Sequence, residues 1–284
     1  EDMGLFGPPA LGAQWVCKAS EDEPAPIITY PAHWVAGEAS RRAPRAIRET
    51  AMRGISLQHL RRLADLIKRA VEWHWIMDTS PFSPTRGRRL EWETLTMYQV
   101  CIYFVMPLTC AGQCSYVESL GEEPAPPAWM TSHWWGCPFE ATLRMLEFHE
   151  SLRKSSAYWI CTLANNQHNL EELQEGSIMN SPFARVLQSS TCIGTVLLCD
   201  PFVSPLQRSW CVFETYLTDM LRSRPQFAPP EICEKSHHFF DVAVPVRDNN
   251  DAQRVAILMD AIDGNWHERT DAPEVMFPLE VATR

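Results

Sequence analysis

Three absences narrow the classes of protein to which this chain of 284 residues can belong. No stretch approaches the roughly 18 uncharged apolar residues that a membrane-spanning helix needs, so we expect no membrane partner. No two cysteines have the C-x-x-C spacing of zinc and redox sites, so we expect no bound metal. The glycine-rich patterns GxxxxGK and GxGxxG are also missing, which excludes P-loop and kinase functions.

The ten cysteines that the chain does carry lie mostly inside apolar runs. Buried free thiols in a reducing compartment explain this placement better than a disulfide framework does. The chain also begins at Glu1 without the pattern of a signal peptide. We therefore expect a soluble, cytoplasmic fragment of a longer protein.

The formal net charge is −10, which does not favour non-specific binding to nucleic acid. The charge is uneven, because the segment from Arg41 to Arg89 holds twelve Arg or Lys residues against four Asp or Glu residues. A solvated helix face followed by a basic loop explains this excess. A phosphate-bearing or acidic protein partner is the alternative explanation.

Prolines and periodicity divide the chain into four regions. Residues 1–54 are rich in Pro, Gly and Ala without a sustained period, which predicts an irregular lead-in. Residues 55–120 are expected to form a helical module. The segment 121–127 contains three prolines and marks a boundary. Residues 127–265 have the pattern of an α/β domain, and residues 266–284 are expected to form a C-terminal tail.

Two helical segments are predicted in the helical module. The first has an apolar stripe that begins after Ser56, which is a suitable N-cap residue. The second runs over residues 91–106, and Pro107 is expected to end it.

Short apolar runs predict four strands after the boundary, at residues 128–133, 157–164, 191–199 and 239–246. Near-continuous runs of this kind suit strands that are buried on both faces, as in a parallel sheet. Helical segments separate these strands, and a further helix is expected over residues 252–262. Strands that alternate with helices predict right-handed βαβ units. In such open sheets the functional site forms beyond the carboxyl ends of the strands.

Polar or aromatic side chains follow each of the first three predicted strands. The first strand leads into residues 132–136 (SHWWG), the second into 165–168 (NNQH), and the third into 207–214 (QRSWCVFE). We expect these three segments to meet at one edge of the sheet.

The segment 209–214 (SWCVFE) resembles the S-x-W-C-x-x-E signature of Toll/interleukin receptor (TIR) domains, shortened by one residue before the tryptophan. In that family the signature opens the helix after the third strand. Its glutamate is the catalytic residue of the members that cleave NAD. The resemblance therefore implies that Glu214 is a catalytic carboxylate.

The other segments resemble those of heterokaryon-incompatibility (HET) domains, which are regarded as distant TIR relatives. Residues 132–136 are similar to S-x-x-W-G, and residues 158–167 are similar to W-I-D-x-x-C-I-N-Q, with Cys161 in place of the aspartate. Residues 208–214 are similar to R-x-W-x-x-x-E, and the same segments resemble uncharacterised protist proteins. Together the resemblances imply a parallel, doubly wound, flavodoxin-like (TIR-like) sheet with an N-terminal helical extension.

Cleavage of the nicotinamide–ribose bond builds positive charge on the ribose, as glycoside hydrolysis does. Nicotinamide leaves as a neutral molecule, so one carboxylate can carry most of the stabilisation. Aromatic rings would hold the pyridinium, and amides would bind the ribose hydroxyls or the carboxamide. The candidate substrate-binding residues are Ser132, His133, Trp134, Trp135, Asn166, Gln167, Ser209 and Trp210.

Each role has a structural alternative. Glu214 could be an ordinary glutamate near the start of a helix, where the dipole stabilises it, and Trp210 could be a core residue. Cys211 could be a nucleophile with His133 as its base, although a buried structural thiol is the favoured interpretation.

Two functions are therefore open. The first is a TIR-like signalling domain with NAD(P) glycohydrolase activity, for which NAD is a substrate and no separate cofactor is expected. The second is a non-catalytic TIR-like module that forms homo-oligomers or binds a partner, with the long loop Asn165–Asn180 as its contact surface.

Overall fold

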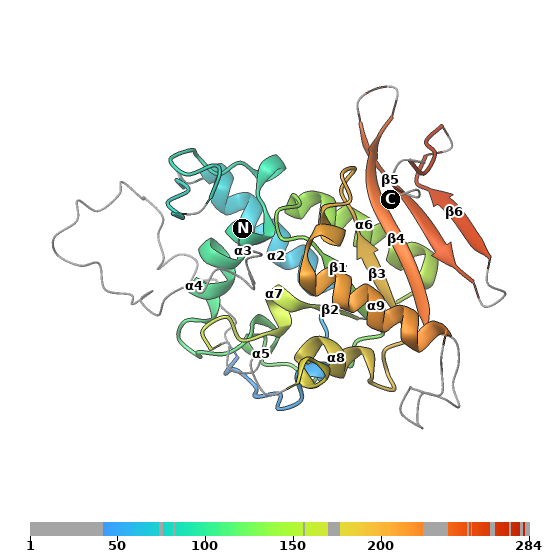
Figure 1. Cartoon of the computed structure of the whole chain (residues 1–284). Coiled ribbons are helices and arrows are strands. Elements are labelled where there is room, and N and C mark those ends of the chain that lie inside the picture. The colour runs from blue at the N-terminus through green and yellow to red at the C-terminus, as the bar shows by residue number, and fades with distance from the viewer. Residues whose placement is uncertain are drawn as a thin grey trace, which may run out of the picture.

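The computed structural model of the chain (Figure 1) is described over residues 42–281, with gaps at 74–75, 82, 156, 170–176, 224–237, 249, 251, 262–264, 273 and 279–280. Most of the lead-in predicted for residues 1–54 lies outside the described residues, as does the middle of the loop Asn165–Asn180. Within the described ranges, no helix combines the length and hydrophobicity that crossing a membrane requires.

A mixed sheet of six strands, in the order β2-β1-β3-β4-β5-β6, forms the centre of the α/β fold. The strands are β1 (Trp129–His133), β2 (Tyr158–Ile160), β3 (Gly194–Leu198), β4 (Phe239–Arg247), β5 (Gln253–Asp260) and β6 (Trp266–Thr270). The first four are mutually parallel, which confirms the four predicted strands as neighbours in one sheet. The second of them is shorter than predicted, because the chain turns into helix α7 (Cys161–Ala164) directly after Ile160.

The helix predicted over residues 252–262 is wrong, because this segment forms β5. β5 pairs antiparallel with β4, and β6 pairs antiparallel with β5, so the sheet is not wholly parallel and it continues beyond residue 265. The run Val255–Met259 is apolar at every position, and such a run fits a buried helix and a buried strand equally well. Pairing with β4 selects the strand, in which Val255 and Ile257 face one core cluster and Ala256 faces another.

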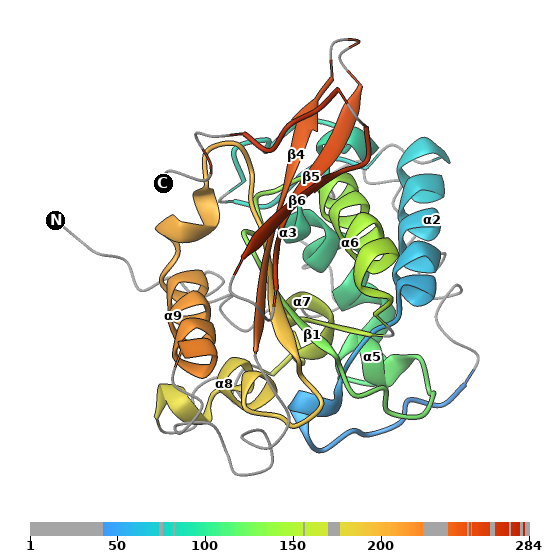
Figure 2. The same ribbon diagram turned by 90° about the vertical axis from the view of Figure 1, so that its right-hand side faces the viewer.

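Helices cover both faces of the sheet (Figure 2). One face carries α6 (Phe139–Arg153), with α2 (Leu57–Trp73) packed outside it, and the other carries α8 (Pro182–Leu187) and α9 (Ser209–Ser223). The predicted N-cap of α2 is confirmed, because the Ser56 hydroxyl accepts a hydrogen bond from the backbone N–H of His59. The described N-terminal helices share one hydrophobic core with α6 and the sheet, so they pack against the α/β fold.

The second predicted helical segment is confirmed as helical but is divided and longer than expected. It comprises η2 (Trp92–Thr94), α3 (Met97–Val100), the π-helical stretch η3 (Cys101–Val105) and α4 (Met106–Thr109). Pro107 does not end it, contrary to the prediction. A proline ring clashes with the carbonyl four residues earlier in a regular α-helix, and the wider π turn directly before Pro107 accommodates it.

Short helices complete the described structure: η1 (Thr50–Met52), α5 (Tyr116–Ser119), η5 (Ile178–Asn180) and η6 (Ser204–Gln207). Strand β1 divides its side chains between the two faces, because successive side chains of a strand alternate. Trp129 packs with His149 of α6, whereas Met130 belongs to the cluster formed by α8 and α9. Ser132 therefore faces α9, and His133 faces the opposite side.

Candidate functional site

Glu214 lies on the inner side of α9, at the carboxyl edge of the parallel strands. Its side chain is turned inward, and only 3% of the residue is exposed. Ser132 is the penultimate residue of β1, close to that edge, and its hydroxyl donates a hydrogen bond of 2.5 Å to Glu214 Oε2. The structure thus brings together two of the predicted site residues that are 82 positions apart in the chain.

The surroundings of Glu214 disfavour its charged form. Burial raises the pKa of this carboxyl to about 8, and the hydrogen bond from Ser132 offsets only part of the rise. Glu214 is therefore mostly protonated at neutral pH. A strongly perturbed carboxyl of this kind, at the strand ends of an α/β sheet, is a candidate for a functional group.

Two thiols lie near the carboxyl of Glu214. Burial, reinforced by the charge of Glu214, raises the pKa of Cys161 to about 12 and raises the pKa of Cys211 further. Both remain protonated thiols at physiological pH. Cys211, whose thiol lies 3.5 Å from the His133 carbonyl oxygen, is therefore a buried structural residue and not an activated nucleophile.

An aromatic pair adjoins this polar cluster. Trp135 donates its indole N–H to the Cys161 sulfur at 3.1 Å, and its ring meets that of Tyr98 edge to face at 5.5 Å. Tyr98 in turn accepts a hydrogen bond of 3.5 Å from the guanidinium of Arg208, directly before α9. Trp135 thus lies beside Cys161, one of the two thiols near Glu214. Tyr98 was not among the predicted site residues, because its position in α3 indicated only a core helix face.

His133 does not join this cluster, because it points to the other face of the sheet. It is only 5% exposed. Burial lowers the pKa of His133 to about 4, so the ring is neutral. The neighbouring Trp134 is half-buried, and its ring lies over Gly136, where a Cβ atom would come within 2.2 Å of it.

Asn166 and Gln167 use their amides to hold the backbone. Gln167 donates to the carbonyls of Cys161 and Thr162 in α7, and so caps the end of that helix. Asn166 donates to the carbonyl of Gln113 and accepts from the backbone N–H of His168. The two amides are therefore engaged within the protein in this conformation.

The remaining predicted residues are Ser209 and Trp210, in the first turn of α9. Ser209 is exposed at the first position of α9. Trp210 stacks on Phe183 of α8 with ring centroids 4.7 Å apart, and it packs against the core cluster of α8 and α9. This agrees with the structural alternative for Trp210, a role in core packing.

Among the described residues, no group of three or more His, Cys, Asp or Glu side chains is arranged to hold a metal ion. The chain matches no protein-family model, and searches of curated proteins and of solved structures give no match. The resemblance to TIR and HET domains therefore depends on the sequence segments alone.

Proposed function

We propose that this chain contains a TIR-like domain that cleaves the nicotinamide–ribose bond of NAD(P), with Glu214 as the catalytic carboxylate. The observation that carries the proposal is the inward-facing carboxyl of Glu214, hydrogen-bonded to Ser132 at the carboxyl edge of the sheet. Sites of open α/β sheets form at this edge.

The strand order supports a flavodoxin-like assignment for the parallel part of the sheet. The order β2-β1-β3-β4, with helices on both faces, matches the beginning of the doubly wound order 2-1-3-4-5. The antiparallel β5 takes the place of the fifth parallel strand. A cytoplasmic location also fits, because the eight described cysteines are free thiols.

A protonated glutamate must lose its proton before it can stabilise an oxocarbenium-like ribose. A pyridinium cation bound beside Glu214 would favour the charged form of the carboxyl, so NAD binding would itself release the proton. The pair of Trp135 and Tyr98 would hold the pyridinium ring. Arg208 and the N-terminus of α9 would bind the pyrophosphate. Because Glu214 is 3% exposed, the side chains around it must move to admit the substrate.

The test is release of nicotinamide from NAD by the purified protein and by its Glu214→Gln variant. We expect the variant to lose about 100-fold or more of the rate, because a transition-state charge loses its partner. Glu93→Gln is a matched control, since Glu93 is exposed at η2. Nicotinamide release that persists in Glu214→Gln would remove the proposed role of this residue.

The alternative is a non-catalytic TIR-like module that assembles with itself. Two apolar side chains at η5, at the end of the loop Asn165–Asn180, favour it: Ile178 is 49% exposed and Met179 is 40% exposed. Sedimentation velocity at several concentrations should then show self-association that Met179→Asp abolishes. Val212→Asp is the control, since Val212 is exposed to a similar extent on α9. A protein that stays monomeric at all concentrations, or an equal effect of both variants, would contradict this alternative.

A further inference from the structure

The amino edge of the sheet, opposite the Glu214 site, carries a cavity of about 570 Å³ that is widely open to solvent. Its apolar lining comes from Phe239, Met259 and Ala261. Arg153 lies at its side, with the guanidinium 4.6 Å from the centre of the Phe239 ring. This volume lies in the range of small-molecule sites, about 300–1,000 Å³.

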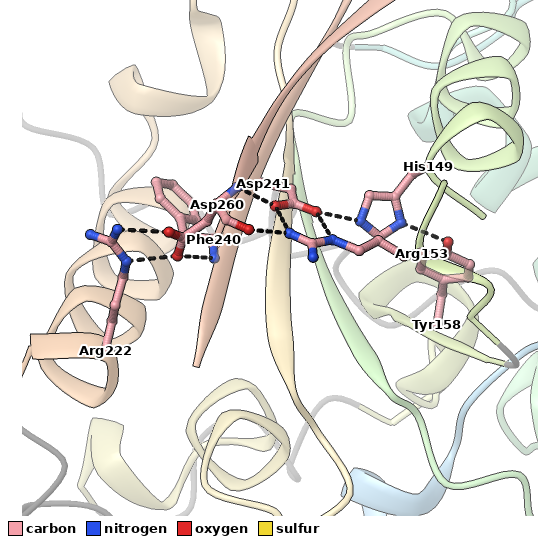
Figure 3. A network of polar contacts seen from close by, with 7 residues as sticks. All are labelled: His149, Arg153, Tyr158, Arg222, Phe240, Asp241 and Asp260. Carbon is pink, nitrogen blue, oxygen red and sulfur yellow. Dashed lines mark hydrogen bonds and ion pairs between the residues drawn. The ribbon is translucent and has the colours of Figure 1, made fainter. Parts of the chain in front are cut away.

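The buried charges beside the cavity are matched one to one (Figure 3). Arg153 binds the carboxylate of Asp241 through Nε and Nη2, at 2.8 and 2.7 Å. Arg222, on α9 at the other face of the sheet, binds Asp260 through two bonds of 2.7 Å. The network therefore leaves no unmatched negative charge at the cavity, although Asp260 is part of its lining.

Strand β6 adds nitrogen-bearing side chains that this network does not use. His267 and Arg269 both line the cavity. They are two positions apart on the strand, so their side chains lie on the same face of the sheet. Trp266 lies on the other face of β6, where it packs against Phe240. Among the described residues, His267 and Arg269 form no salt bridge and no side-chain hydrogen bond. The chain has a net charge of −10, so a positive charge at a mostly apolar cavity is a local exception that favours binding of an anionic ligand there.

We propose that this cavity is a second ligand site, for a small molecule that joins a flat apolar ring to an acidic group. The ring would lie against Phe239 and Met259. The acidic group would bind Arg269 and His267 through charge-assisted hydrogen bonds. A nucleoside monophosphate and an aromatic carboxylate share this chemistry.

Isothermal titration calorimetry with two acids and their uncharged counterparts tests the proposal. The pairs are adenosine 5′-monophosphate with adenosine, and 1-naphthoate with 1-naphthalenemethanol. We expect at least one acid to bind about tenfold more tightly than its counterpart, since a hydrogen bond to a charged group has roughly that effect. The acid that binds more tightly identifies the source, a nucleotide or an aromatic acid.

Arg269→Ala should weaken that binding by about tenfold. The substitution should not disturb the fold, because Arg269 is exposed on the edge strand. Arg88→Ala removes one exposed positive charge elsewhere and should leave binding unchanged. Arg208→Ala should also leave it unchanged, which separates this site from the proposed NAD site, where Arg208 would bind the pyrophosphate. No binding of either acid at millimolar concentration, equal binding of acid and counterpart, or equal effects of Arg269→Ala and Arg88→Ala would overturn the proposal.

Discussion

The two edges of the sheet bury carboxyl groups in opposite ways. At the carboxyl edge, Glu214 has one hydrogen-bond donor among the described residues, the Ser132 hydroxyl, and burial raises its pKa to about 8. At the amino edge, Asp241 is fully buried but accepts hydrogen bonds from Arg153, His149 and the backbone N–H of Asp260. Burial alone would raise the pKa of Asp241, yet the bonds from Arg153 and His149 outweigh it and hold the pKa below its ordinary value.

The number of donors therefore decides the charge state of each buried carboxyl. Asp241 stays ionised and links α6 to β4 and β5, as Figure 3 shows, so its role is structural. Glu214 stays neutral, and among the described residues its carboxyl forms no salt bridge. A group poised in this way changes its charge when a cation arrives, which is what the proposed reaction requires.

The largest expected effect on the free energy of unfolding comes from breaking the amino-edge network. Asp241→Ala removes the carboxylate that pairs with the partly buried Arg153 guanidinium and with the fully buried His149, so we expect the free energy of unfolding to fall by about 3–5 kcal/mol. Chemical denaturation measures the change. Asp65→Ala is the control, because Asp65 is exposed on α2, and its effect should stay within about 0.5 kcal/mol. A loss of less than about 1 kcal/mol in Asp241→Ala would show that the network is not structural.

Sequence patterns predicted the parallel strands because each is a short apolar run buried on both faces. They could not assign β5, since only its pairing with β4 distinguishes strand from helix in the run Val255–Met259. The sequence also contained a signal for the amino-edge network that we did not use in predicting the site. Asp241 interrupts the apolar run of β4, and an aspartate in a buried strand requires a partner. Its partner Arg153 lies 88 positions away, so no local pattern could identify it.

At the carboxyl edge, the family resemblance indicated Ser132, Trp135 and Glu214, but not how they are arranged. The bond from Ser132 to Glu214 follows from the alternation of β1 and from the helix face of α9 together, and those two elements meet only in the folded chain. The same limit explains why Tyr98 was missed, since its partner Arg208 lies 110 positions away. Asn166 and Gln167 were predicted as ligand-binding amides. In the structure Gln167 donates to carbonyls of α7, and Asn166 donates to the carbonyl of Gln113.

A second effect should appear in the dependence of stability on pH. Because the folded pKa of Glu214 is raised, the folded state keeps a proton that the unfolded state loses, so stability falls as pH rises toward the folded value of about 8. Glu214→Gln carries no such proton. We therefore expect its stability relative to the unmodified protein to increase by about 1.4 kcal/mol for each pH unit between about pH 5 and pH 8.

Denaturation of both proteins across this range measures the difference, in which the contributions of other titrating groups cancel. The nearby thiols of Cys161 and Cys211 do not interfere, because burial keeps both protonated throughout. Asp241 has the opposite sign: its lowered pKa adds stability above the unfolded value, and that stability is lost only in acid. A difference between Glu214→Gln and the unmodified protein that is independent of pH would mean that Glu214 is ionised when folded, and the contrast between the two edges would fail.

The smallest effect is expected from Ser132→Ala, which removes the only hydroxyl that donates to Glu214 among the residues that the structure describes. An unsatisfied buried acceptor costs about 1–2 kcal/mol of the free energy of unfolding. Because the bond from Ser132 lowers the pKa of Glu214, its loss should raise that pKa further. The infrared band of the protonated carboxyl, identified by its absence in Glu214→Gln, should then persist to higher pH. Ser209→Ala, at an exposed serine of the same helix, should leave the band unchanged. If both serine variants titrate alike, the single donor does not set the charge state, and the difference between the two edges must arise from burial alone.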